Sequence, residues 1–216
     1  MYKKKDYFIT GYRDWRREFA EYKYLIFLSL LVFIIAAFLD YFSGVYTTTS
    51  AKTVYVPDLI LDHIGPVDLS FIYIWGYIFF FLTLLLYPIF FHIRSLHIVI
   101  SQFSLLVMLR AVFVLLTHLH TPQDAIIANF PGVFEKLSFQ NDMFFSGHTA
   151  IPFLGFLMFK DKIRYMFLFG SILMGTVVLL MHIHYSIDVF GAFFITYGSY
   201  KIANLLIRKA KHYLIS

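Results

Sequence analysis

Residues 98–118 read IVISQFSLLVMLRAVFVLLTH, an apolar run without glycine or proline in which Arg110 is the only Lys, Arg, Asp or Glu. About 20 such residues suffice for a helix to cross a bilayer. Five more apolar runs occur, of which the third and fourth are short: 24–42, 71–91, 144–159, 165–182 and 187–207. Barrel strands would instead alternate with a period of two. The sequence therefore predicts an all-α protein, a polytopic bundle of six transmembrane helices.

The composition favours a membrane protein. Of the 216 residues, 60% are hydrophobic and only 14% are charged, whereas soluble domains hold about 25% charged residues. The hydrophobicity also excludes intrinsic disorder. Because the chain has no cysteine, disulfides, thiol catalysis and cysteine-ligated zinc are excluded. The formal charge of +5 is interpreted by its placement, as a topology signal and not as nucleic-acid binding.

Basic residues are unevenly distributed between the two sides that six spans would create. Of the 18 Lys and Arg residues, all except Lys52, Lys136 and Arg110 fall on the side of the termini. Such an excess marks the cytoplasmic side. We therefore expect both termini in the cytoplasm. The segments 43–70, 119–143 and 182–186 should face the exoplasm, that is, the exterior, the periplasm or a lumen.

Three parts follow from this topology. Residues 24–207 form the transmembrane domain, and residues 208–216 form a basic cytoplasmic tail. In residues 1–23, aromatic residues recur at helical spacing among arginines: Phe8, Tyr12, Trp15 and Phe19. This pattern is typical of an amphipathic helix that lies on an anionic membrane surface. A solvated basic tail is the alternative.

Ionisable residues inside membrane spans are costly and are therefore candidates for function. Lys201 lies about two turns from the inner end of its span, from where it can snorkel to the interface. Arg110 lies near the middle of its span, so snorkelling is harder. We expect Arg110 to bind an anion.

Two polar motifs lie at the start of the apolar runs 144–159 and 187–207. In Ser146-Gly147-His148-Thr149, free N–H groups at a helix N-terminus could cradle a phosphate, Gly147 would allow close approach, and His148 could exchange a proton. His184 and Asp188 are four residues apart and would share one face of a helix, so the carboxylate can hold one ring nitrogen and leave the other as nucleophile or base. An interfacial histidine capped by an acid is the alternative for this second motif.

The topology brings both motifs to one outer face, with Arg110 in a neighbouring helix. Two histidines, an acid, an arginine and a helix N-terminus at one membrane depth indicate phosphoryl transfer on a lipid. Neither motif has the ligand count of a zinc site, and the chemistry requires no metal or other cofactor.

At these residues the chain resembles the sphingomyelin synthase family, within the wider lipid phosphate phosphatase (phosphatidic acid phosphatase type 2) superfamily. Residues 141–149, NDMFFSGHT, resemble the third motif of that family. Residues 182–189, HIHYSIDV, resemble its fourth motif, with Ser186 where threonine is usual. Weaker similarities occur in residues 56–62, VPDLILD, and at Arg110 with its downstream residues Thr117 and Pro122.

The resemblance implies six spans, an exoplasmic active site and metal-free transfer of a phospho-head-group between lipids. It makes His184 the nucleophile, Asp188 its orienting partner, and His148 the acid and then the base. Further positions match the motifs and would bind substrate or phosphate: Arg110, Ser146, Gly147, Asp142, Tyr185, Asp58 and Asp62.

Departures from the superfamily pattern narrow the function. Ala111 follows Arg110 where phosphatases have proline, and Val177 and Val178 occupy the positions of a Ser-Arg pair. Both departures favour the synthase-like branch over an ordinary phosphatidate phosphatase. Asn141 replaces the usual glycine, and the extended N-terminal region of the eukaryotic enzymes is missing, which leaves the head group and the acceptor open.

The expected function is that of an integral-membrane lipid head-group phosphotransferase. It would move a phospho-head-group from a phospholipid donor to a lipid hydroxyl acceptor through a phosphohistidine. The alternative is a lipid phosphatase or phosphodiesterase that uses water as the acceptor. A transporter or scaffold is disfavoured, because its polar residues should be spread along a path through the bilayer. The oligomeric state stays open.

Overall fold

The computed structural model describes residues 11–132, 139 and 141–215, with side chains described as far as residue 207. This part of the chain contains six α-helices: α1 (Tyr12–Thr49), α2 (Ser70–Phe91), α3 (Leu96–Leu116), α4 (Gly147–Met158), α5 (Ile163–Leu180) and α6 (Ser186–Ile215). Two 3-10 helices precede α2 and α3: η1 (Leu61–His63) and η2 (Ile93–Ser95). Its only extended pairing is an isolated bridge between Val54 and Leu119. The prediction of an all-α protein is confirmed.

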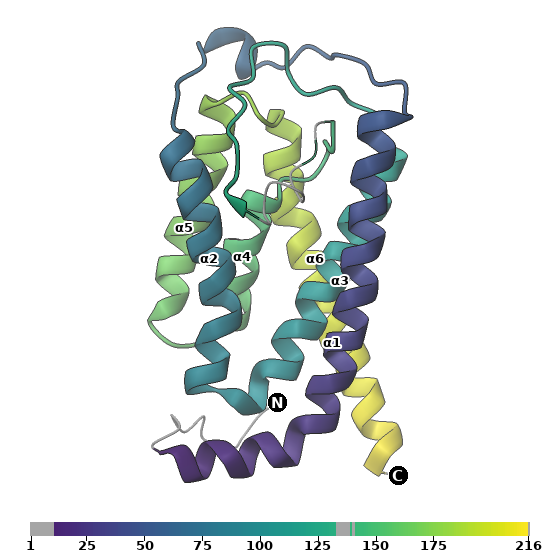
Figure 1. Ribbon diagram of the computed structural model, residues 1–216, viewed down its shortest axis with the longest axis vertical. Helices are drawn as coiled ribbons and strands as arrows, with labels where there is room; N and C mark the ends of the chain where they lie inside the picture. The colour runs from purple at the N-terminus through teal and green to yellow at the C-terminus, as the bar shows by residue number, and fades with distance from the viewer. Residues whose placement is uncertain (1–10, 133–138, 140, 216) are drawn as a thin grey trace.

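The helices run up and down along the long axis of the molecule (Figure 1). The start of α1 and the end of α6 lie at one end of the bundle, together with the connections after α2 and α4. The connections after α1, α3 and α5 lie toward the opposite end, called the loop end below. This is the alternation that the predicted topology requires. Which end faces the cytoplasm stays a prediction.

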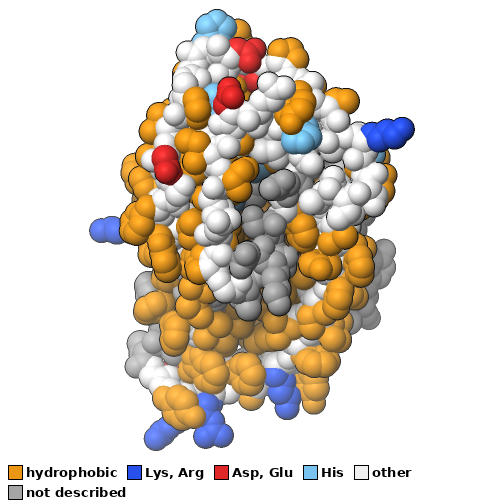
Figure 2. All heavy atoms as spheres, turned by 45° about the horizontal axis from the view of Figure 1, so that its top comes forward, with side chains coloured by type: hydrophobic (Ala, Val, Ile, Leu, Met, Phe, Trp, Pro, Cys, Tyr) orange, Lys and Arg blue, Asp and Glu red, His pale blue; other side chains and the backbone are white. Residues whose placement is uncertain are grey.

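Four helical segments are long and apolar enough to cross a membrane: α1, α2, Ile93–Leu116 and α5. α4 is apolar but has only 12 residues, fewer than the about 20 that a crossing needs. α6, within its described residues, is not among the four segments. The prediction of a helical membrane protein is therefore confirmed, whereas six complete crossings stay a prediction. Figure 2 shows hydrophobic side chains over the flank of the molecule, and Asp, Glu and His side chains at the loop end.

α1 is a single helix of 38 residues, so the expected boundary near residue 23 is not a break in the helix. Its first turns run across the bundle axis, and the rest runs along it (Figure 1). Trp15 donates its indole N–H to the carbonyl of Ile89 at 2.7 Å, one of the carbonyls that the end of α2 leaves unpaired. Glu18 pairs with Arg94 at 2.6 Å. Trp15 therefore packs on the bundle, and Phe8 lies outside the described residues. That the N-terminal segment lies on a membrane surface stays a prediction.

The core between α2, α4 and α5 depends on two small residues. A Cβ added at Gly155 would lie 2.4 Å from the Phe167 ring, and one at Gly170 would lie 2.1 Å from the Phe80 ring. Both rings belong to the largest buried cluster. The absent side chains therefore let the helices approach closely and fix the position of α4, which carries His148.

Candidate functional site

His184 and Asp188 form the centre of the candidate site. The Nδ1 atom of His184 lies 3.0 Å from Oδ2 of Asp188, and the Asp188 side chain is fully buried. Because a carboxylate can only accept, Nδ1 carries a proton, and in the neutral ring Nε2 then keeps its lone pair. α6 begins at Ser186, so the pair is made between the preceding turn and the first helical turn, not along a helix as we expected.

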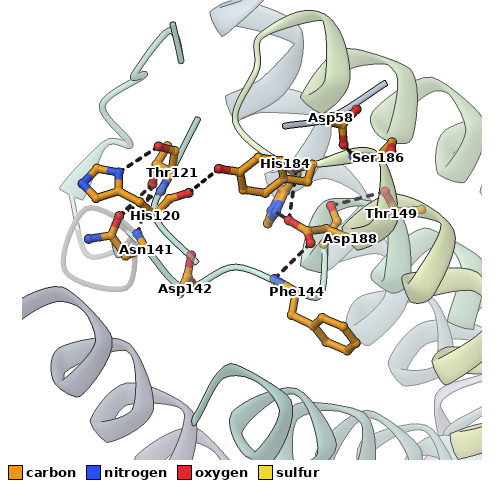
Figure 3. A network of polar contacts seen from close by, with 12 residues as sticks. Asp58, His120, Thr121, Asn141, Asp142, Phe144, Thr149, His184, Ser186 and Asp188 are labelled. Atoms are coloured by element: carbon orange, nitrogen blue, oxygen red, sulfur yellow. Dashed lines mark hydrogen bonds and ion pairs between the residues drawn. The ribbon is translucent and has the colours of Figure 1, made fainter. Parts of the chain in front are cut away.

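Backbone groups hold the Asp188 carboxylate in place (Figure 3). Oδ1 accepts the N–H of Phe144 at 3.1 Å, and Oδ2 accepts the N–H of Tyr185 at 3.1 Å. The position in the first turn of α6 also places the negative charge at the positive end of the helix dipole. The Asp188 carboxylate is therefore fixed by groups that do not depend on His184.

The two motifs are joined directly. The N–H of Ser146 donates to the backbone carbonyl of Asp188 at 3.3 Å, and the Ser146 hydroxyl accepts a hydrogen bond from Thr149. A Cβ added at Gly147 would lie 3.9 Å from Nε of Arg110, so the start of α4 lies close to the guanidinium group. The expected convergence of the Ser-Gly-His and His-Asp segments is thus present in the geometry.

His148 lies between aromatic rings. Its ring is stacked on Tyr73, with centroids 4.2 Å apart, and is tilted against Tyr77 at 4.5 Å. Its Nε2 atom is buried and has no hydrogen-bond partner among the described residues. A buried nitrogen without a partner is costly, and at this position it is available to a ligand.

Arg110 makes two ion pairs. Its Nη1 atom lies 2.7 Å from Oδ1 of Asp40 in α1, and its Nη2 atom pairs with Oδ2 of Asp142 in the loop before α4. Both ends of the guanidinium fork are therefore occupied by carboxylates, and the group of three carries a formal charge of −1. The sequence analysis did not predict a role for Asp40. The argument applied to Arg110, that an ionisable residue inside a membrane span is a candidate for function, also applies to Asp40, because Asp40 is the one acid in the 24–42 run.

Three residues without glycine's freedom have positive φ next to the site: Asn141 at 62°, Phe144 at 90° and His182 at 55°. Asparagine tolerates this left-handed conformation, which glycine adopts readily. Its side-chain oxygen accepts the N–H of Thr121 at 2.9 Å. Phe144 is the more strained residue, and its N–H is the one that reaches Asp188.

A cavity of about 230 Å³ joins these groups. Five of the predicted site residues line it: Arg110, Asp142, Gly147, His148 and His184. Its walls also include three residues that the sequence analysis missed: Asp40, Tyr73 and Tyr77. The tyrosines carry no sequence signal that separates them from ordinary core aromatics.

Five other predicted residues are not part of the cavity wall. Asp188 and Ser146 lie outside the wall and hold the wall residues in place through the contacts described above. Tyr185 donates its hydroxyl to the carbonyl of His120 at 2.9 Å, away from the cavity. Asp62 is exposed in η1. Asp58 contacts the start of α6.

Asp58 acts as a cap. Its Oδ2 atom accepts the N–H of Ser186 at 2.7 Å, at the start of α6, and its Oδ1 atom accepts those of Ile60 and Leu61. Burial raises the pKa of the Asp58 carboxyl, but these hydrogen bonds outweigh it and leave the pKa below its ordinary value. Asp58 therefore positions the His184 turn from the loop end.

The site thus holds an oriented imidazole, a second histidine with an unsatisfied nitrogen, and an arginine, all facing one cavity. Such a set can carry out nucleophilic substitution with proton transfer at a phosphorus centre. The described residues contain no cluster of three or more His, Cys, Asp or Glu side chains suited to a metal ion. No protein-family model matches the chain, and no curated protein matches it either. The family resemblance therefore stays a prediction from the sequence motifs.

Proposed function

We propose that the protein is a membrane-embedded lipid head-group phosphotransferase of the sphingomyelin synthase-like type, with six spans and its site on the exoplasmic side. The observation that carries the proposal is the cavity that His184, His148 and Arg110 line together. One histidine is oriented by a buried acid, and the other has a nitrogen free for a proton. A structural histidine pair would not need either property.

In the first step, Nε2 of His184 attacks the phosphorus of a phospholipid donor. The bond from phosphorus to the lipid oxygen breaks, and His148 in its protonated form gives its proton to that oxygen. The products are a neutral lipid alcohol and a phosphohistidine that carries the head group. Asp188 keeps Nδ1–H in place and stabilises the positive charge that develops on the imidazole.

In the second step, His148, now neutral, takes the proton of an incoming lipid hydroxyl. The hydroxyl oxygen attacks phosphorus and the bond from phosphorus to Nε2 breaks, which restores both histidines. Water in place of the lipid hydroxyl gives the hydrolase, which is the second candidate function. The buried, mainly aromatic surroundings of His148 limit access of water and favour the transferase.

The proposal is tested by trapping the intermediate. Purified protein in lipid vesicles is mixed with a phospholipid labelled with ³²P and quenched in alkali, which preserves phosphohistidine. The label should map to His184, and His184→Ala should abolish it, whereas His63→Ala, a change at an exposed histidine of η1, should keep it. Label on His148, or turnover without any covalent species, would refute the mechanism. Mass spectrometry of the products with and without a lipid acceptor separates transferase from hydrolase.

A further inference from the structure

We infer that the lipid substrate enters the cavity sideways from the bilayer, through an opening beside α1 with Ala37 and Tyr41 at its rim. In this arrangement only the head group and the adjoining chain atoms enter the protein, and the rest of the chains stays in the membrane. The inference rests on the proposed function and adds how the site receives its substrate class.

The size of the cavity requires part of a lipid to stay outside. Its volume is about 230 Å³, below the about 300–1,000 Å³ of pockets that enclose a drug-sized ligand. A phospholipid with two long chains is larger than such a ligand. The chains therefore need a way out of the cavity while the phosphate is at Arg110.

Aromatic rings close the cavity toward the end that holds the termini. Phe103 of α3 lies 5.6 Å from Phe33 of α1 and 5.8 Å from Phe81 of α2, measured between ring centroids. All three rings line the cavity. The three rings join α1, α2 and α3 between the polar groups and the end of the molecule that holds the termini, so the lipid chains cannot leave the cavity toward that end.

The side between α1 and α2 is not closed by helix packing. α1 packs along α3, and α2 packs along α5, but α1 and α2 do not form a packed pair within the described ranges. Ala37 and Tyr41 line the cavity from α1 and are nevertheless exposed. Next to them on α1, Ile34 and Phe38 are 49% and 59% exposed. The opening therefore lies on an apolar flank of the molecule.

The position of this opening along α1 fits the depth of the hydrocarbon layer. Ala37 is twelve residues before Thr49, the end of α1, which is about 18 Å along a helix that rises about 1.5 Å per residue. Between Ala37 and Tyr41, Asp40 binds Arg110 at 2.7 Å. A lipid that enters here passes an apolar rim first, and its phosphate then meets the guanidinium group.

The test uses a cysteine placed at the rim, because the native chain has none. Ala37→Cys is folded, inserted in vesicles and then treated either with a small methylating thiol reagent or with a bulky maleimide. Labelling of His184 is measured with a long-chain phospholipid and with bis(p-nitrophenyl) phosphate, a water-soluble phosphodiester. Ile34→Cys, exposed on the same helix outside the cavity, is the matched control.

We expect the bulky group on Ala37→Cys to slow labelling from the phospholipid by about tenfold or more, since small displacements of a reacting group are costly. The small reagent should have little effect, labelling from the soluble diester should persist, and Ile34→Cys should respond to neither reagent. If the bulky group leaves phospholipid labelling unchanged, or reduces both substrates equally, lateral entry at α1 is overturned. Absence of labelling in the untreated wild type would instead overturn the proposed function.

Discussion

Replacing Asp40 with asparagine should make the protein bind inorganic phosphate more tightly. In the unliganded site Arg110 is shared by Asp40 and Asp142, so an anion that reaches the guanidinium group must compete with two carboxylates. The asparagine side chain would keep the size of the original one and one of its acceptor oxygens. The change removes one negative charge beside the position that the phosphate takes.

The magnitude follows from the geometry. Two unit charges about 4 Å apart interact by about 4 kcal/mol at an effective dielectric constant of about 20. The Asp40 side chain is 27% exposed and the Arg110 side chain 15%, so solvent weakens both the attraction of Asp40 to Arg110 and the repulsion of a phosphate by Asp40. If about a third of this interaction energy remains, removing the Asp40 charge improves phosphate binding by about 1.4 kcal/mol, a tenfold lower Kd.

The assay is calorimetric titration of phosphate into purified protein in detergent, which does not depend on turnover. Asp40→Glu keeps the charge and should bind phosphate about as the wild type does. Asp14→Asn, which alters an exposed pair with Arg17, controls for the net charge of the protein. An unchanged or weaker affinity in Asp40→Asn would show that Asp40 orients Arg110 for the anion instead of competing with it.

Three further variants test the supports of the site. Asp188→Asn leaves one acceptor oxygen for the two backbone N–H donors of Phe144 and Tyr185, so it should lower the Tm modestly without unfolding the protein. It should slow phosphohistidine formation by about 10²–10⁴-fold, since His184 loses its charged partner; a rate within threefold of wild type would contradict this. Asp58→Asn should lower the Tm in detergent. Because the folded pKa of Asp58 is below its ordinary value, the Tm difference from wild type should be full at neutral pH and shrink as the pH falls below about 4; a difference independent of pH would exclude the carboxylate as its cause. Asn141→Gly and Asn141→Val both lose the hydrogen bond to Thr121, but Asn141→Val should lower the Tm further because a β-branched residue resists a φ of 62°; equal Tm values for the two would argue against that backbone conformation.

Local patterns predicted the helices well. Apolar runs located each helix to within a few residues at most ends, because burial in lipid demands long uninterrupted hydrophobic segments. The exceptions have physical causes. α4 is shorter than its run at 144–159, because residues 144–146 belong to the strained turn that carries Phe144 to Asp188. α1 and the end of α6 extend far beyond their runs, because polar residues such as Arg16 and Glu18 form helix as well as apolar ones do.

The site was predictable where its residues are close in sequence. The spacing of His184 and Asp188 was enough to expect their contact, and the shared outer face was enough to expect His148 nearby. The pairing of Arg110 with Asp40 joins residues 70 positions apart, and it depends on how α1 packs on α3. The cap that Asp58 forms on Ser186 spans 128 positions. Sequence spacing carries no information on such contacts, which is why Asp58 was assigned to substrate binding.

α1 ties the candidate site to the opposite end of the molecule. Glu18 and Asp40 both form ion pairs with other helical segments. The 21 residues between them contain neither glycine nor proline, and the two positions are about 33 Å apart along the helix. Only part of this length runs along the bundle axis, because the first turns of α1 lie across it (Figure 1). A bilayer that is thicker or thinner than the apolar part of α1 must tilt or bend the helix, and the strain falls on the ion pair at Arg110. The lipid composition of the host membrane thereby becomes a variable that acts on the site mechanically, without any ligand.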